Sequence, residues 1–336
     1  MNTSDLRNAL EARQVWIYFA AVLVAAVVGL LIPGTAVLEG AINPALALML
    51  FVTFLQVPVA ALGRALGELR FMGALLAVNF IAVPLLVLGL VQFLPADPLI
   101  RLGVLMVLLC PCIDYVVTFA HLGKADARLL LASTPVLLIA QMALLPIYLR
   151  LFLGSEAAAY VQPGPFIHAF VWLIAVPFVL AALVQAWAAR SATGERVSSW
   201  LGLAPAPATA LVLFIVVAAV LPQLGETLDR TLSVIPIYAA FAVLAPMIGW
   251  VGSRLAGLAP DAGRAIAFSA GTRNSLVVLP LALVVPGAIP LVPAVIVTQT
   301  LIELLSELAY VRLLSRLGGP TSVRSTQACG PSPPSP

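Results

Sequence analysis

Leu109-Cys110-Pro111-Cys112-Ile113-Asp114 interrupts an apolar run that is otherwise typical of a membrane-spanning helix. A polar group without a partner in hydrocarbon is costly, so these groups should face a cavity or one another. Pro111 lacks a backbone N–H and disfavours helical geometry at Cys110, which predicts that the helix breaks at the thiols. A helix broken at membrane depth is typical of a transport site.

The composition indicates the class of protein. Apolar residues make up 62% of the 336 residues, charged residues make up 9%, and the mean hydropathy is +1.11. About a quarter of the residues of a soluble domain are charged, so we expect an all-α polytopic membrane protein. The basic residues are scattered, which argues against a nucleic-acid partner. A disulfide between Cys110 and Cys112 would be strained, and Cys329 lies in a polar tail.

Windows of about 20 apolar residues indicate membrane spans. We expect ten, at residues 15–36, 42–63, 71–94, 99–120, 127–153, 164–187, 201–221, 232–254, 263–286 and 289–312. Residues 1–14 are then a cytoplasmic N-terminus, and residues 313–336 are expected to form a disordered cytoplasmic tail.

Lysine and arginine are concentrated in every second connection between the predicted spans. Thirteen of the 17 lie on the side of the N-terminus, and only Arg101, Arg150 and Arg230 lie on the other. This asymmetry predicts that both termini are cytoplasmic, in a multi-pass protein of the cell (inner) membrane. Arg273 alone falls inside a span, the ninth.

A repeat relates the two halves of the chain. The segments at 44–51 and 207–214 share six of eight residues at an offset of 163. The same offset places Cys110, Pro111 and Cys112 on Arg273, Asn274 and Ser275. We therefore expect a duplicated five-helix unit, over residues 15–153 and 164–312. A unit with an odd number of spans inserts its second copy upside down, which predicts inverted repeats whose broken helices four and nine cross at mid-membrane.

The thiols and the carboxylate of the first cluster each have more than one interpretation. At the start of a half-helix, Cys112 would feel the positive end of the dipole, and thiolates are ligands for soft metals and metalloids. Alternatively, both cysteines pack as small hydrophobic side chains. Asp114 could carry a coupled proton, pair with Arg273, or only complement the helix dipole.

The second cluster needs a counter-charge, because Arg273 cannot lose its proton. Asp114, Glu303 or a bound oxyanion could supply it, and Asn274 and Ser275 add neutral donors and acceptors. Alternatively, Arg273 forms an internal salt bridge and touches no substrate.

Four further polar residues lie in the spans. Glu303 is a possible proton site, whereas Glu307, one turn farther along, is expected to extend to the membrane surface. Gln56 and Asn79 could line the same cavity or bond between helices.

These residues together suggest a family. The chain resembles the bile acid/sodium symporter superfamily and, within it, the arsenical-resistance permeases that expel arsenite. The segments 112–117, 268–274 and 301–303 carry the resemblance, which covers all ten spans. It implies a core domain and a panel domain, crossing helices four and nine, and Cys112 as the residue that engages the metalloid.

The chain departs from its relatives at specific positions. Leu276 replaces a glutamate that is usual in the arsenite permeases, and Cys110 and Asp114 are not part of their usual pattern. The acid and glutamine that bind sodium in other members fall on Ser269 and Arg273, so the resemblance implies proton coupling and not sodium coupling.

The sequence thus favours a secondary transporter for a small oxyanion or metalloid substrate, with proton-driven export of arsenite or antimonite. In this hypothesis Cys112 and Cys110 engage the metalloid and Asp114 or Glu303 exchanges the proton. The alternative is a symporter for a small organic anion, with Arg273 as the carboxylate clamp. An enzyme with a cysteine nucleophile is disfavoured because the two histidines, His121 and His168, lie near span ends, and a channel is disfavoured by the repeat. No cofactor or bound metal is expected.

Overall fold

The computed structural model describes residues 3–56, 68–113, 115–154, 163–223, 225 and 228–319. Within these ranges the chain is helical, and the only extended pairing is an isolated bridge between two interrupted helices. The α-helices are α1 (Thr3–Leu31), α2 (Glu39–Phe54), α4 (Leu69–Ala77), α5 (Val83–Val91), α6 (Pro98–Leu108), α7 (Val116–Leu122), α8 (Ala127–Leu153), α10 (Pro163–Phe170), α11 (Val176–Ala188), α12 (Ala192–Leu201), α13 (Pro205–Val220), α14 (Leu228–Leu232), α15 (Ile235–Leu255), α16 (Pro260–Gly271), α17 (Ser275–Leu283) and α18 (Leu291–Leu313). Shorter turns join them: η1 (Thr35–Leu38), the π-helical η3 (Val78–Ala82) and η5 (Val171–Ala175), η6 (Leu221–Gln223) and η8 (Leu314–Arg316).

Eight helical segments in the described residues are long and apolar enough to cross a membrane. They are Arg13–Leu31, Thr35–Phe54, Leu69–Val91, Ala127–Leu153, Val171–Ala188, Pro205–Gln223, Asp229–Leu255 and Leu291–Arg316. The prediction of an all-α polytopic membrane protein is confirmed. The fourth and ninth predicted spans are each divided into two shorter helices, α6 with α7 and α16 with α17.

The first interruption lies at the thiols, where the sequence predicts it. α6 begins after Asp97, whose carboxylate accepts two backbone N–H bonds of the first turn, and it ends at Leu108. α7 begins only at Val116, so Pro111 lies in the break. A proline cannot donate the backbone hydrogen bond that would continue the helix.

The second interruption contains no proline. α16 ends at Gly271, and the backbone of Thr272 is extended, with φ −106° and ψ 129°. Asn274 then caps α17, because its side-chain oxygen accepts a hydrogen bond from the Val277 N–H at 3.4 Å. A capping asparagine starts a new helix and so fixes where the break ends.

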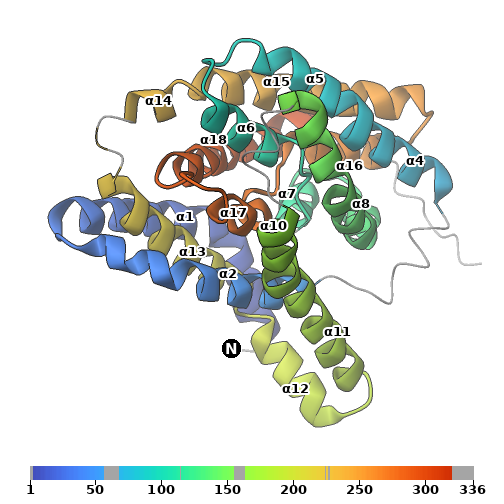
Figure 1. The fold of residues 1–336 in the computed structure, drawn as a ribbon. Coiled ribbons are helices and arrows are strands. Elements are labelled where there is room, and N and C mark those ends of the chain that lie inside the picture. Colours follow the sequence, from blue (N-terminus) through green and yellow to red (C-terminus); the bar gives the residue numbers. More distant parts are fainter. Residues whose placement is uncertain are drawn as a thin grey trace, which may run out of the picture.

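The helices form two packed groups (Figure 1). In the first, α1 and α2 pack against α13, and α11 packs against α2. The second contains both interrupted helices: α18 packs against α6, α15 and α17, and α15 packs against α16. α7 belongs to this second group through its contacts with α8 and α16.

The structure differs from the predicted boundaries at three places. α1 spans Thr3–Leu31, so residues 3–14 of the predicted N-terminal segment 1–14 belong to the first helix. The amphipathic helix α12 was not predicted, because its charged residues lack the apolar run that marks a span. Leu314 is buried in η8, so the predicted tail begins with an ordered turn.

Several predicted features lie outside the described residues. They are the end of the second span within 57–67, most of the connection between the two halves at 155–162, Asp114, and the tail from residue 320 with Cys329.

Gly249 sets the close approach of α15 to α16. A Cβ atom at this position would lie 2.8 Å from the Ala267 Cα and 2.9 Å from the Ile266 carbonyl oxygen. Gly249→Val should therefore push the two helices apart and destabilise the protein by about 1–3 kcal/mol. The measurement is the melting temperature of the purified protein in detergent. Gly89→Val is the matched control, since no atom lies within 4 Å of its Cβ position, and equal melting temperatures would contradict the close packing.

Candidate functional site

The two interrupted helices meet at their breaks, in a segment pair (residues 110–112 and 272–274) that we call the crossing. Pro111 and Arg273 face each other in an antiparallel bridge. Two backbone hydrogen bonds flank it, from the Asn274 N–H to the Cys110 carbonyl at 2.8 Å and from the Cys112 N–H to the Thr272 carbonyl at 3.0 Å. These bonds satisfy backbone groups that lost their helical partners. As predicted, the two polar clusters lie close together.

The buried guanidinium of Arg273 turns back onto the ends of two half-helices. Its Nη2 donates to the Ser269 and Ala270 carbonyls in the last turn of α16, at 2.5 and 2.7 Å. Nη2 also donates to Asn79 Oδ1 at 2.9 Å, and Nη1 donates to the Leu108 carbonyl at the end of α6, at 3.4 Å. The carbonyl end of a helix carries partial negative charge, which stabilises a cation there. The acceptors of the guanidinium that the structure describes are all neutral.

Glu303 of α18 lies at the crossing, where three donors hold its carboxyl group. The Arg273 N–H and Gln299 Nε2 donate to Oε2 at 2.5 and 2.6 Å. The Tyr115 hydroxyl donates to Oε1. Hydrogen bonds from three neutral groups stabilise a buried negative charge, and this charge balances the nearby guanidinium.

Ser275 acts through a neighbour of Glu303. Its hydroxyl donates to Gln299 Oε1 at 3.0 Å, which orients the amide nitrogen of Gln299 toward the carboxyl group of Glu303. Ser275 and Glu303 therefore belong to one hydrogen-bonded chain.

Two buried donors at the crossing are unused. Arg273 Nε and Asn274 Nδ2 have no hydrogen-bond partner in the described part of the chain. Cys110 and Cys112 lie in the same segment pair as reduced, fully buried thiols, and the guanidinium of Arg273 acts electrostatically on both. The crossing thus combines soft sulfur ligands with donors that suit oxygen atoms.

The remaining predicted residues divide into three cases. Asn79 joins the crossing from the π-helical turn η3, where it binds Arg273 and also donates to Ser269 Oγ at 3.0 Å. Gln56 lines a separate cavity. Asp114 lies outside the described residues.

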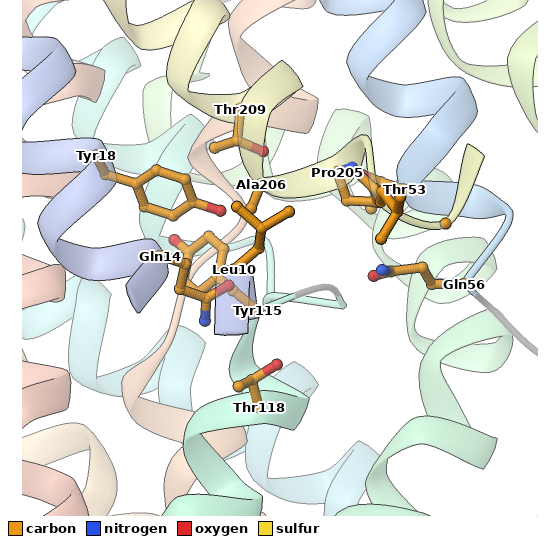
Figure 2. Close-up of a pocket in the computed structure, with 12 residues that line it drawn as sticks. Leu10, Gln14, Tyr18, Thr53, Gln56, Tyr115, Thr118, Pro205, Ala206 and Thr209 are labelled. Atoms are coloured by element: carbon orange, nitrogen blue, oxygen red, sulfur yellow. The ribbon is translucent and has the colours of Figure 1, made fainter. Parts of the chain in front are cut away.

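The cavity lies between α7 and the α1, α2 and α13 group (Figure 2). Its volume is about 30 Å³, which is room for about two water molecules. Its polar lining residues are all uncharged: Gln14, Tyr18, Thr53, Gln56, Tyr115, Thr118 and Thr209. Tyr115 connects the cavity to the crossing, since its hydroxyl donates to Glu303.

Sequence reasoning missed several of these residues. Gln299 precedes Glu303 by one helical turn, so helical periodicity alone places both on one face. Tyr115 follows the opening cluster directly and could have been included with it. Gln14 and Tyr18 of α1 carry no such signal, because their role depends on which helix packs opposite them.

One expectation is wrong. Glu307 was expected to extend to the membrane surface, but its side chain is fully buried. Its carboxyl group is hydrogen-bonded to the Thr272 hydroxyl in the second break. α18 presents this face to the other helices, so the side chain has no route to the surface.

The comparison with known families agrees with this architecture. A model of the sodium bile acid symporter family matches residues 43–225, which is more than half of the chain. The matched range includes the first break and ends before Arg273 and Glu303. No curated protein matches the chain. The chain is a multi-pass membrane protein and belongs to the sodium bile acid symporter family.

Proposed function

We propose that the protein is a secondary active transporter that exports arsenite and antimonite in exchange for protons. The observation that carries this proposal is that two buried thiols lie at one crossing with two donors that have no hydrogen-bond partner among the described residues. Cys112, together with Cys110, engages the soft metalloid. Arg273, Asn274 and Ser275 hold its oxygen atoms.

The proposal includes the transport architecture. Ten transmembrane helices form two inverted five-helix repeats, with α6/α7 and α16/α17 as the broken helices four and nine. The antiparallel bridge supports this arrangement, because it has the local two-fold symmetry that inverted repeats require. The second group of helices is the core domain, and it rocks against a panel made of α1, α2, α11 and α13.

The position of Arg273 supports proton coupling in this proposal. Its guanidinium supplies, at the ends of α6 and α16, a permanent positive charge that a bound sodium ion would otherwise supply. Asp114 or Glu303 is the proposed proton acceptor. Both termini are cytoplasmic in this proposal, in the cell inner membrane, so the metalloid enters the site from the cytoplasm.

A second candidate is a symporter for a small organic anion, which the family match favours. It would use Arg273 as a carboxylate clamp. The geometry favours it less, because a two-point carboxylate clamp needs a terminal nitrogen of the guanidinium, and both already donate to protein oxygens. Nε remains for a single substrate oxygen. The cavity beside α7 also has no charged side chain among its described lining residues.

Counterflow in proteoliposomes separates the two candidates. Vesicles loaded with unlabelled arsenite, antimonite or a carboxylate such as cholate are diluted into trace labelled substrate. We expect exchange of arsenite or antimonite and none of the carboxylates. Exchange of a carboxylate, without exchange of either metalloid, would establish the organic anion symporter instead.

A further inference from the structure

Glu307 is a buried acid that the proposed function does not use. It lies on α18, one turn beyond Glu303, and its side chain has no exposed surface. It faces the second break, where Thr272 is its hydrogen-bond partner. The protein therefore holds two carboxyl groups on one buried face of α18.

The partners of Glu307 are few. Its Oε1 is paired with the Thr272 hydroxyl, and its Oε2 has no partner in the described part of the chain. The Thr272 hydroxyl also lies 2.7 Å from the Phe268 carbonyl oxygen. A hydroxyl has a single hydrogen, so Thr272 cannot donate to both oxygens. If it donates to the carbonyl, the hydrogen in the bond to Glu307 must come from the carboxyl group itself.

No opposite charge compensates Glu307 among the residues that the structure describes. Glu303 and Tyr310, both on α18, are the titratable groups that act on it. The Tyr310 hydroxyl donates to the Ala242 carbonyl of α15. From the second break, the guanidinium of Arg273 points away, to the ends of α6 and α16. An ionised Glu307 would thus stand unpaired beside the negative charge of Glu303.

The contrast with Glu303 is direct. Glu303 receives three hydrogen bonds, which favour its ionised form. Among the described residues, Glu307 has one hydroxyl partner, and its second carboxyl oxygen has none. Two carboxyl groups one turn apart avoid mutual repulsion when only one of them is charged. The geometry assigns the charge to Glu303 and the proton to Glu307.

We propose that Glu307 is protonated in this conformation and that Glu307, in place of Asp114 or Glu303, is the carboxyl group that carries the coupled proton. The transport role of Glu307 rests on the proposed function, whereas its protonation state does not. When the break at Thr272 moves away from α18, water reaches the carboxyl group. The O–H bond of Glu307 then breaks, and the proton leaves to that water as hydronium while the carboxylate remains.

The protonation state is tested without any substrate. Infrared spectra of the purified protein at neutral pH should contain the C=O band of a protonated carboxyl group. Glu307→Gln should remove this band, whereas the matched variant Glu303→Gln and the exposed control Glu195→Gln should keep it. A band that persists in Glu307→Gln would overturn the assignment. Thr272→Val keeps the acid and removes its partner, so it should shift the band, and an unshifted band would also contradict the assignment.

The transport role is tested in proteoliposomes. Glutamine mimics a protonated glutamate, so Glu307→Gln should retain arsenite counterflow and lose accumulation driven by a pH gradient. Accumulation with the wild-type pH dependence would refute Glu307 as the proton carrier. If the wild-type protein moves neither arsenite nor antimonite, the proposed function fails, and the infrared result still decides whether Glu307 holds a proton.

Discussion

Cells that express Cys112→Ser are expected to lose their arsenite tolerance and to become as sensitive as cells without the transporter. A serine oxygen is a hard ligand and does not replace a thiolate toward a soft metalloid. Each 1.4 kcal/mol of lost binding energy lowers affinity about tenfold, so the loss of a sulfur ligand should lower the affinity for arsenite steeply. The measurement is the growth-inhibiting arsenite concentration at equal membrane abundance of the two proteins.

Cys110→Ser is the matched control, because it places the same hydroxyl group at the crossing, two residues away. It should keep part of the tolerance, since the Cys110 backbone carbonyl that binds Asn274 remains. Cys329→Ser should behave as the wild type. Full tolerance in Cys112→Ser would show that the thiol packs as a small hydrophobic side chain and does not bind the substrate.

Arg273→Ala should prevent the accumulation of folded protein. The change removes the donor to Asn79 and to the Ser269 and Ala270 carbonyls, and it leaves these buried oxygens unpaired. Each unsatisfied buried acceptor costs about 1–3 kcal/mol, so the loss is comparable with the total stability of an ordinary domain. Expression level and size-exclusion profile in detergent report the outcome.

Two further variants show whether the guanidinium itself is required. Arg273→Lys keeps the charge but not the planar fork, so it should yield less folded protein than the wild type and more than Arg273→Ala. Arg254→Ala removes an exposed arginine from the end of α15 and should be neutral. A monodisperse Arg273→Ala protein with wild-type yield would contradict the role of Arg273 at the ends of α6 and α16.

The first break could be predicted from local chemistry alone. Pro111 lacks the backbone N–H that would continue the helix and disfavours helical geometry at Cys110, and the break lies where the sequence places it. The second break has no such marker. It was predicted only because the offset of 163 connects Arg273 with the first cluster, and the capping role of Asn274 then explains where α17 begins.

The partners across the crossing could not be predicted, because they depend on packing between distant segments. Asn79 reaches Arg273 from the π-helical turn η3, which leaves no clear pattern in the sequence. Glu307 shares a helical face with Glu303, so its burial follows from periodicity once the burial of Glu303 is known. The hydrogen bond between Thr272 and Glu307 could not be predicted in this way, because it depends on how α16 ends.

The most direct test of the proposed function is arsenite accumulation in sodium-free proteoliposomes under an imposed pH gradient. Vesicles with the acidic interior should concentrate labelled arsenite through protein inserted with its cytoplasmic side outward. A proton ionophore should abolish the accumulation, and added sodium should not change it. Accumulation that requires a sodium gradient and ignores the pH gradient would contradict proton-coupled export.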